Sequence, residues 1–122
     1  MNEVVIKPSL REQFLQGWAQ CRVIFFSAPC GFGKSTAATA LLSNHKTCVF
    51  SAEDPEFLHE PVPKNVDAIV IDSLPALKDP VDQQTLCAWI RENPELHFVI
   101  LSRGVLPGWL MPFRFTGLLQ LI

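Results

Sequence analysis

One stretch of this chain, Ser27 to Thr36, constrains the fold more than any other, and its sequence is S-A-P-C-G-F-G-K-S-T. An apolar run, Val23 to Phe26, precedes it, and an alanine-rich helical pattern from Thr36 to Leu42 follows it. A glycine-rich turn between a strand and a helix lets backbone N–H groups approach phosphate oxygens without side chains in the way. The setting therefore predicts a strand, a phosphate-binding loop and a helix in direct succession.

The residue types in this loop suit a nucleoside triphosphate with Mg²⁺. Lys34 is expected to neutralise the β- and γ-phosphates, and Ser35 to supply a hydroxyl ligand to Mg²⁺. Thr36 adds a hydroxyl at the N-terminus of the helix, whose dipole favours the anion. Ala28 departs from the usual pattern, which begins with Gly, but Ala is tolerated where φ is negative. The predicted nucleotide-binding residues are Ala28, Gly31, Phe32, Gly33, Lys34, Ser35 and Thr36.

Apolar runs alternate with helical patterns along the whole chain, which predicts an α/β fold with a mostly parallel five-stranded sheet. The expected strands are residues 22–27, 47–51, 68–71, 97–102 and 118–122, and the expected helices are residues 9–20, 36–42 and 80–92. One helical turn is expected around Pro55 to His59, and an irregular loop from Gly104 to Phe115. Since nothing follows the last strand to cover it, we expect residues 1–122 to be part of a larger protein.

Two helix starts carry capping patterns. Ser9 and Glu12 have the spacing of a capping box, with Pro8 just ahead of it. Asp79 and Pro80 have the order of an N-cap followed by the first helical residue. The first helix is expected to dock through Leu10, Phe14 and Trp18, and the later one through Val81, Thr85, Leu86, Trp89 and Ile90.

In a parallel α/β sheet the ligand site lies at the carboxyl ends of the strands, and candidate residues follow three of them. Asp72 follows the strand of residues 68–71 and is expected to hold Mg²⁺ together with Ser35. Arg103 follows the fourth strand and is expected to sense the γ-phosphate and stabilise charge during its transfer. The predicted catalytic residues are thus Lys34, Asp72 and Arg103, and the predicted metal ligands are Ser35 and Asp72.

No catalytic base is evident in the sequence. The position after Asp72, which often carries a second acid to activate the attacking water, is occupied by Ser73. Glu53 and Asp54 follow the second strand and are candidates to approach the γ-phosphate, although solvated loop acids are the favoured interpretation. This combination fits binding of ATP better than fast hydrolysis.

The composition of the chain limits the partners that it is expected to bind and indicates its location in the cell. The net charge of −2 gives no electrostatic reason to expect nucleic acid or anionic lipid on this domain. The N-terminus lacks the pattern of a signal peptide, and no apolar run is long enough to span a membrane. The four cysteines have no zinc-ligand spacing, which favours reduced thiols and a cytoplasmic location. His45, His59 and His97 likewise have no metal-ligand spacing.

Phe26 to Thr36 resembles the S-A-P-x-G-[FY]-G-K-[ST]-T form of the phosphate loop in STAND signal-transduction ATPases. Among these, the chain is most similar to large maltose-activator-like regulators of the LuxR type. The likeness extends to Ser51-Ala52-Glu53-Asp54, to Val70-Ile71-Asp72-Ser73-Leu74, where the family usually has two acids, and to Leu101-Ser102-Arg103.

The resemblance implies a three-layer P-loop NTPase fold of the ASCE type, with the fourth strand between the first strand and the strand before Asp72. It implies an ATP/ADP switch with slow or no hydrolysis, in which Arg103 senses the γ-phosphate. It also implies a transcriptional regulator whose full-length form assembles into an ATP-dependent homo-oligomer. Such regulators bind DNA through further domains, and none of these lies within residues 1–122.

Two other functions remain open on the same residues. A small-molecule kinase uses the same kind of loop, although it would need an acceptor pocket and an arginine-rich lid that the sequence does not show. A non-hydrolysing interaction scaffold would keep the loop without using it. A GTPase is disfavoured because no N-K-x-D segment is present to recognise guanine.

Overall fold

The computed structural model describes residues 8–27 and 45–121. Its centre is a five-stranded sheet in which every neighbouring pair is parallel, in the order β2-β3-β4-β1-β5. The strands are β1 (Val23–Ser27), β2 (Thr47–Ser51), β3 (Ala68–Asp72), β4 (His97–Ser102) and β5 (Leu119–Leu121). The expected sheet is confirmed, including the position of β4 between β1 and β3.

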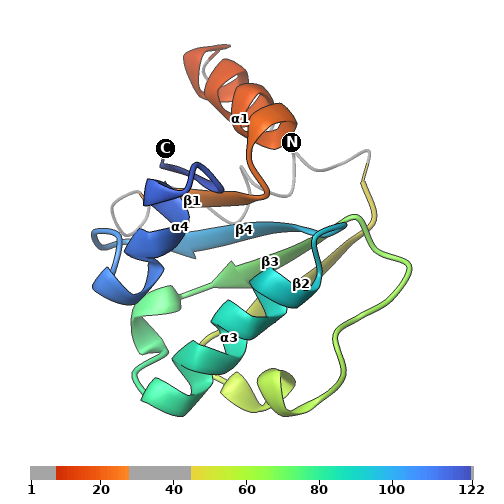
Figure 1. Cartoon of the computed structure of the whole chain (residues 1–122), viewed down its shortest axis with the longest axis vertical. Coiled ribbons are helices and arrows are strands. Elements are labelled where there is room, and N and C mark those ends of the chain that lie inside the picture. The colour runs from red at the N-terminus through yellow and green to blue at the C-terminus, as the bar shows by residue number, and fades with distance from the viewer. Residues whose placement is uncertain (1–7, 28–44, 122) are drawn as a thin grey trace, which may run out of the picture.

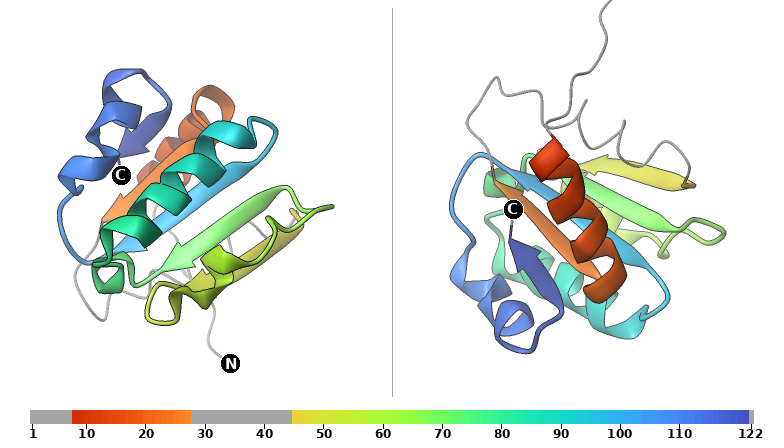
Figure 2. Two further views of the ribbon diagram at one scale, coloured as in Figure 1. Left: turned by 60° about the horizontal axis from the view of Figure 1, so that its bottom comes forward. Right: turned by 90° about the horizontal axis from the view of Figure 1, so that it is seen from above.

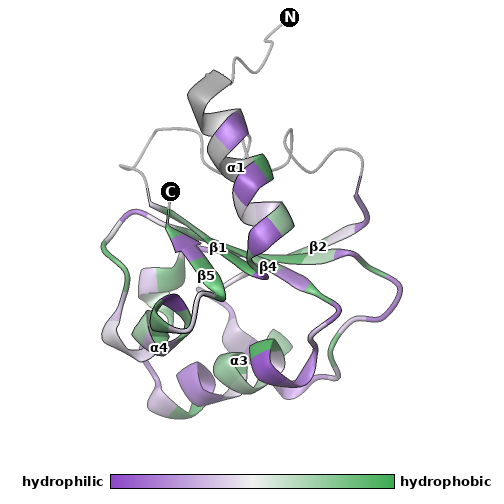
Figure 3. Cartoon of the chain, turned by 45° about the horizontal axis from the view of Figure 1, so that its top comes forward, coloured by the Kyte–Doolittle hydropathy of each residue, from purple (hydrophilic) through white to green (hydrophobic). Residues whose placement is uncertain are grey.

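The inner strands form because their sequences are apolar without alternation, which suits a strand covered on both faces. In β1, β3 and β4, nearly every side chain is buried. The edge strand β2 is more open, and its Val49 is 61% exposed. Figure 3 shows β1 and β4 as a hydrophobic band between the helices on the two faces of the sheet.

Helices cover both faces, so the fold has three layers (Figures 1 and 2). Helix α1 (Pro8–Gln20) lies on one face, and helix α3 (Pro80–Glu92) and helix α4 (Met111–Phe115) lie on the other. Alternate strand residues such as Phe25, Ile71 and Phe98 form one core with Leu86 and Ile90 of α3. The helix expected at residues 36–42 lies outside the described residues.

Helix α1 begins one residue earlier than its capping pattern predicted. Pro8 is the first helical residue, so Ser9 is inside the helix and is not its N-cap. Proline is well suited to this place because the first turn leaves its N–H groups unbonded in any case. The side chains of Leu10 and Phe14 lie outside the described residues, whereas Trp18 is half-buried and stacks on His97 with ring centroids 3.8 Å apart.

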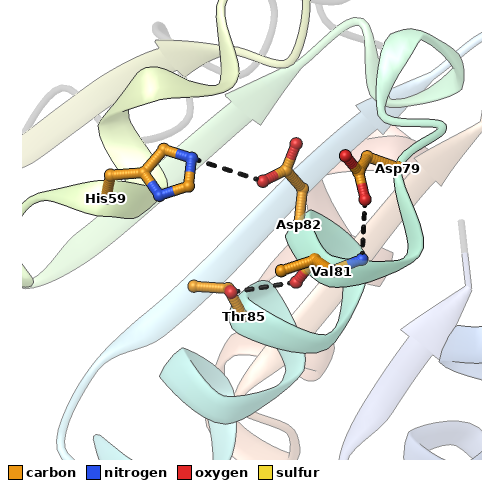
Figure 4. Close-up of polar contacts among 5 residues, drawn as sticks. All are labelled: His59, Asp79, Val81, Asp82 and Thr85. Carbon is orange, nitrogen blue, oxygen red and sulfur yellow. Dashed lines mark hydrogen bonds and ion pairs between the residues drawn. The ribbon is translucent and has the colours of Figure 1, made fainter.

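Helix α3 begins as predicted. The Asp79 carboxylate accepts a hydrogen bond from the Val81 N–H at 2.9 Å (Figure 4). Pro80 is the first helical residue. At the other end, the Arg22 guanidinium donates to the carbonyls of Ile90 and Asn93 at 2.8 and 3.0 Å. These bonds satisfy carbonyls that a helix end leaves without intrahelical partners.

The expected buried face of α3 is partly wrong. Val81 is 62% exposed, and Asp82 is buried in its place, with only 8% exposed. The imidazole of His59 lies 3.6 Å from the Asp82 carboxylate, so the buried acid faces a polar partner (Figure 4). His59 ends the 3₁₀ helix η1 (Pro55–His59), which confirms the helical turn expected there.

The segment from Gly104 to Phe115 was predicted to be an irregular loop, and this prediction is partly wrong. It contains a 3₁₀ helix, η3 (Gly108–Leu110), followed directly by α4. Pro112 is compatible with a helix because it stands in the first turn. Leu110 and Phe113 are buried in the core, so tertiary packing stabilises a short helix that local propensity disfavours.

Within residues 8–27 and 45–121, no helix is long and apolar enough to cross a lipid bilayer.

Candidate functional site

The strand register brings the predicted residues to one edge of the sheet. Ser51 at the end of β2 is level with Asp72 at the end of β3, and Ser27 at the end of β1 is level with Ser102 at the end of β4. Because all strands run in one direction, the residues that follow them leave the sheet at the same edge. This is the edge at which α/β folds bind ligands.

A cavity of about 180 Å³ opens at this edge. Its lining includes Glu53, Asp72, Ser73, Leu101, Ser102 and Arg103, which come from the ends of β2, β3 and β4. Two predicted site residues, Asp72 and Arg103, therefore line one cavity. Glu53, which the sequence placed among solvated acids, lines the same cavity, whereas the neighbouring Asp54 does not.

Asp72 is held at the point where the chain turns away from the sheet. Its carboxylate accepts a hydrogen bond from the Ser73 N–H at 2.8 Å, and its backbone carbonyl accepts one from the Ala52 N–H at 2.8 Å. Ser73 adopts a left-handed conformation with φ of 60°. That conformation is uncommon for a residue with a side chain, and it directs the chain from β3 into the 3₁₀ helix η2 (Leu74–Ala76).

Arg103 is exposed, but the residues on both sides of it are tied down. The buried Ser102 hydroxyl accepts a hydrogen bond from the Gly104 N–H at 3.0 Å. The Gly104 carbonyl accepts one from the Ser27 hydroxyl at 2.8 Å. These bonds attach the turn that carries Arg103 to the end of β1. Sequence reasoning gave Ser27 and Ser102 no role, although each is a serine directly after an apolar strand.

The remaining predicted site residues, Ala28, Gly31, Phe32, Gly33, Lys34, Ser35 and Thr36, lie outside the described residues. What the structure does describe is the strand from which this loop departs. Ser27, the last described residue before the loop, lies at the cavity edge of the sheet, between β4 and β5. The loop therefore begins beside the turn of Arg103.

The donor groups in the described part of the site suit Mg²⁺. Magnesium prefers oxygen ligands and commonly uses one or two carboxylates together with substrate phosphates. Asp72 supplies a half-buried carboxylate at a cavity large enough for small oxygen ligands. Across the described ranges, no group of three or more His, Cys, Asp or Glu side chains is arranged to hold a metal ion by itself.

A second group of titratable side chains lies at the opposite, amino edge of the sheet. His97 begins β4, and its Nε2 lies 3.0 Å from the Trp18 carbonyl. Burial lowers the pKa of His97, and the nearby His45 and Arg22 lower it further, while the Trp18 carbonyl and Asp67 oppose the change. His45 lies against the Trp18 ring and 3.7 Å from the Asp67 carboxylate. Sequence reasoning found only that these histidines lack metal-ligand spacing and missed their contact through Trp18.

None of the three described cysteines lines the cavity at the carboxyl edge. Cys21, Cys48 and Cys87 are free thiols. Burial raises the pKa of Cys87, and the neighbouring Arg91 only partly offsets this. A buried thiol with a raised pKa is a poor nucleophile, so its contribution is to packing in the core.

Comparison with known proteins supports the fold. No family model and no curated protein matches the sequence. Among solved structures, the chain is similar to one in the structure of Drosophila ORC bound to AT-rich DNA and Cdc6, with a TM-score of 0.61 and 11% sequence identity. The match covers 93% of this chain and 53% of that chain, so the sequence spans about half the length of its neighbour.

At 11% identity, this likeness establishes the fold and nothing finer. The present chain therefore shares its α/β fold, with a parallel five-stranded sheet between helices, with that structure.

Proposed function

We propose that this chain is the ATP-binding switch domain of a STAND-type signalling or transcriptional regulator. The observation that carries the proposal is the convergence of Asp72, Arg103 and Glu53 on one cavity. That cavity lies at the sheet edge from which β1 leads into the glycine-rich loop. An acid, a cation and a phosphate-loop sequence at one strand edge match what binding of a nucleoside triphosphate requires.

Each residue has a defined part in this proposal. Backbone N–H groups of the loop from Gly31 to Thr36 surround the phosphates, and Lys34 neutralises the β- and γ-phosphates. Ser35 and Asp72 hold Mg²⁺, which supplies charge neutralisation at the phosphates when bound. Arg103 contacts the γ-phosphate, so its turn distinguishes ATP from ADP.

We further propose that other domains of the full-length protein take part in the wider function. In our proposal the nucleotide state controls assembly of the full-length protein into a homo-oligomer, DNA is bound by other domains, and the protein acts in the cytoplasm, where ATP is supplied. Slow or absent hydrolysis accords with Ser73 next to Asp72, since a hydroxyl is a poor general base at neutral pH.

The first test measures the stability of the 122-residue chain with and without Mg-ATP. A ligand at 100 times its Kd raises the free energy of unfolding by about 2.7 kcal/mol. Lys34→Ala is expected to abolish this stabilisation, because the principal cation at the phosphates is lost. Asp72→Asn is expected to remove the dependence on Mg²⁺ while keeping the fold, since the amide oxygen still accepts from Ser73.

The matched control is Lys64→Ala, which removes an exposed lysine from the loop before β3 and is expected to leave the stabilisation unchanged. Equal stabilisation of wild type and Lys34→Ala by Mg-ATP would overturn the site assignment. No stabilisation of the wild type at millimolar Mg-ATP would favour the interaction scaffold instead. Transfer of the γ-phosphate to a small acceptor would favour the kinase.

A further inference from the structure

A second and larger cavity, of about 440 Å³, lies beside the proposed nucleotide site. One wall comes from the chain after β3, including Leu74, Pro75 and Leu77. The other wall comes from the chain after β4, including Val105, Pro107 and Trp109. The two cavities share Pro75 and Ser102, so they are neighbours at the same sheet edge. The nucleotide-binding role proposed for the first cavity does not involve the second cavity.

Both walls are held in place by hydrogen bonds. The Leu77 N–H donates to the Leu74 carbonyl at 2.8 Å, and the Gln83 amide donates to the Leu77 carbonyl at 2.9 Å. On the opposite wall, the Leu110 N–H donates to the Pro107 carbonyl at 3.0 Å. Because Leu74, Leu77 and Leu110 are also buried, the cavity is preformed, as small-molecule sites usually are.

The lining is mainly apolar, and it exposes hydrophobic surface to solvent. Val105 is 88% exposed, although it lies in a turn whose flanking residues, Ser102 and Leu106, are buried. Trp109 is half-buried and presents an aromatic surface to the cavity. A volume of about 440 Å³ falls in the range of small-ligand pockets, roughly 300–1,000 Å³. Its size therefore favours a small organic molecule.

A single cation stands in this apolar lining. Lys78 is exposed, stands directly before Asp79, the N-cap of α3, and lines the cavity. Among residues 8–27 and 45–121, no carboxylate forms an ion pair with it. The adjacent Asp79 carboxylate accepts a hydrogen bond from the Val81 N–H and caps α3. The charge of the cavity is therefore complementary to an anion.

We propose that this cavity binds a small amphipathic carboxylic acid. Its apolar body contacts Leu77, Val105 and Trp109, and its carboxylate pairs with Lys78. The proposal does not depend on nucleotide binding. It has a consequence for the neighbouring site, however, because Arg103 lies in the same turn as Ser102, Gly104 and Val105. A ligand packed against Val105 would therefore lie two residues along the chain from Arg103.

The test uses 4-phenylbutyrate as the probe and the full chain without nucleotide. Amide and indole N–H resonances are followed by NMR during the titration, with Trp109 and Val105 as reporters of the cavity. Trp18, at the opposite edge of the sheet, is the internal control. We expect saturable shifts at Trp109 and Val105 and none at Trp18. The neutral analogue 4-phenylbutanol should bind about threefold more weakly, the effect of losing one exposed ion pair.

Two variants check the two halves of the site. Lys78→Gln should weaken 4-phenylbutyrate binding about threefold and leave 4-phenylbutanol binding unchanged. Val105→Glu should weaken acid binding further, because it adds a negative charge and removes apolar contact. Lys64→Gln, at an exposed lysine that does not line the cavity, is the matched control and should bind like wild type.

Three results would overturn the proposal. The first is the absence of saturable shifts at Trp109 and Val105 at millimolar probe. The second is equal affinity for 4-phenylbutyrate and the cationic 4-phenylbutylamine, since Lys78 would then select nothing. The third is concentration-dependent dimerisation that Val105→Glu abolishes in sedimentation experiments, which would assign the cavity to a second copy of the chain.

Discussion

Glu53 and Asp54 are adjacent acids after β2, yet only Glu53 lines the cavity with Asp72. The two are anchored by different groups of Ser51: the Glu53 N–H donates to its hydroxyl at 3.2 Å, and the Asp54 N–H donates to its carbonyl at 3.1 Å. The turn therefore presents the two side chains to different surroundings. We therefore propose that the slow hydrolysis that remains without a second acid beside Asp72 depends on Glu53.

Replacing Glu53 by Gln tests this role. The rate of ATP hydrolysis, which we expect to be slow, should fall about 100-fold, the usual effect of losing a general base. Affinity for Mg-ATP should be unchanged, because the amide keeps the size and polarity of the carboxylate. Single-turnover hydrolysis of radiolabelled ATP measures the rate. Asp54→Asn is the control, and an equal loss of rate in both variants would refute a specific role for Glu53.

His97 links the stability of the fold to pH. Its pKa is lowered in the folded chain, chiefly by burial, so folding favours the neutral imidazole. Between the lowered pKa and the ordinary value near 6.5, the unfolded chain binds more protons than the folded one. The free energy of unfolding therefore has its full value above about pH 6.5, and this contribution is lost as the pH falls through the lowered pKa.

Urea unfolding at pH 7.5 and pH 5.5 measures this effect. The wild-type chain should be less stable at the lower pH, and His97→Gln should show a smaller loss, since Gln has no proton to take up. The Gln amide can still donate to the Trp18 carbonyl, so the variant keeps that hydrogen bond. Identical losses in the two proteins would exclude His97 as the group responsible.

At the scale of elements, the spacing of apolar residues in α3 predicts the burial of some side chains correctly and that of others wrongly. Leu86, Trp89 and Ile90 are buried as their spacing predicts. Val81 belongs to the same periodic set and lies in the first turn, but it is 62% exposed. Asp82 is buried instead, next to His59 of η1. Spacing along one helix does not reveal which partner segment covers each turn.

A matched pair of variants measures this difference. Leu86→Ala should lower the free energy of unfolding by about 2 to 5 kcal/mol, because it removes buried apolar volume and leaves a cavity. Val81→Ala should change it by less than about 0.5 kcal/mol, the usual range for an exposed position. Chemical denaturation of both variants supplies the values. Similar losses would mean that Val81 packs against the core in solution.

In the segment after β4, the turn-forming residues led to a wrong prediction of the local structure. Pro107, Gly108 and Pro112 favour turns, and they predicted an irregular loop. Leu110 and Phe113 are nevertheless buried in the same core as Leu86 and Ile90, and this burial stabilises η3 and α4. A short helix that depends on packing cannot be identified from propensity, because its stabilising contacts come from distant parts of the chain.

At the scale of the whole molecule, the sheet order decides which strand ends meet. β4 lies between β1 and β3, so the turn of Arg103 stands between the departure of the phosphate loop and Asp72. Neighbouring strands in space are distant in sequence: β1 pairs with β4, some 75 residues further along the chain. The parallel α/β sheet thereby brings together Asp72, Arg103 and the start of the proposed phosphate loop from separate segments of the chain.

The sequence alone determined the five strands, the helices α1 and α3, and the candidates Asp72 and Arg103. It could do so because apolar runs, caps and strand-end polar residues are local features. The predicted order of the strands in the sheet came from the resemblance to STAND ATPases. No local pattern in the sequence indicates which strands are neighbours. Only the tertiary structure separated Glu53 from Asp54, buried Asp82 beside His59, and formed the cavity between Lys78 and Trp109. Each of these three features involves segments that are distant in the sequence and approach one another only when the sheet and its helices pack. This packing depends on contacts throughout the chain, so no local pattern reveals it.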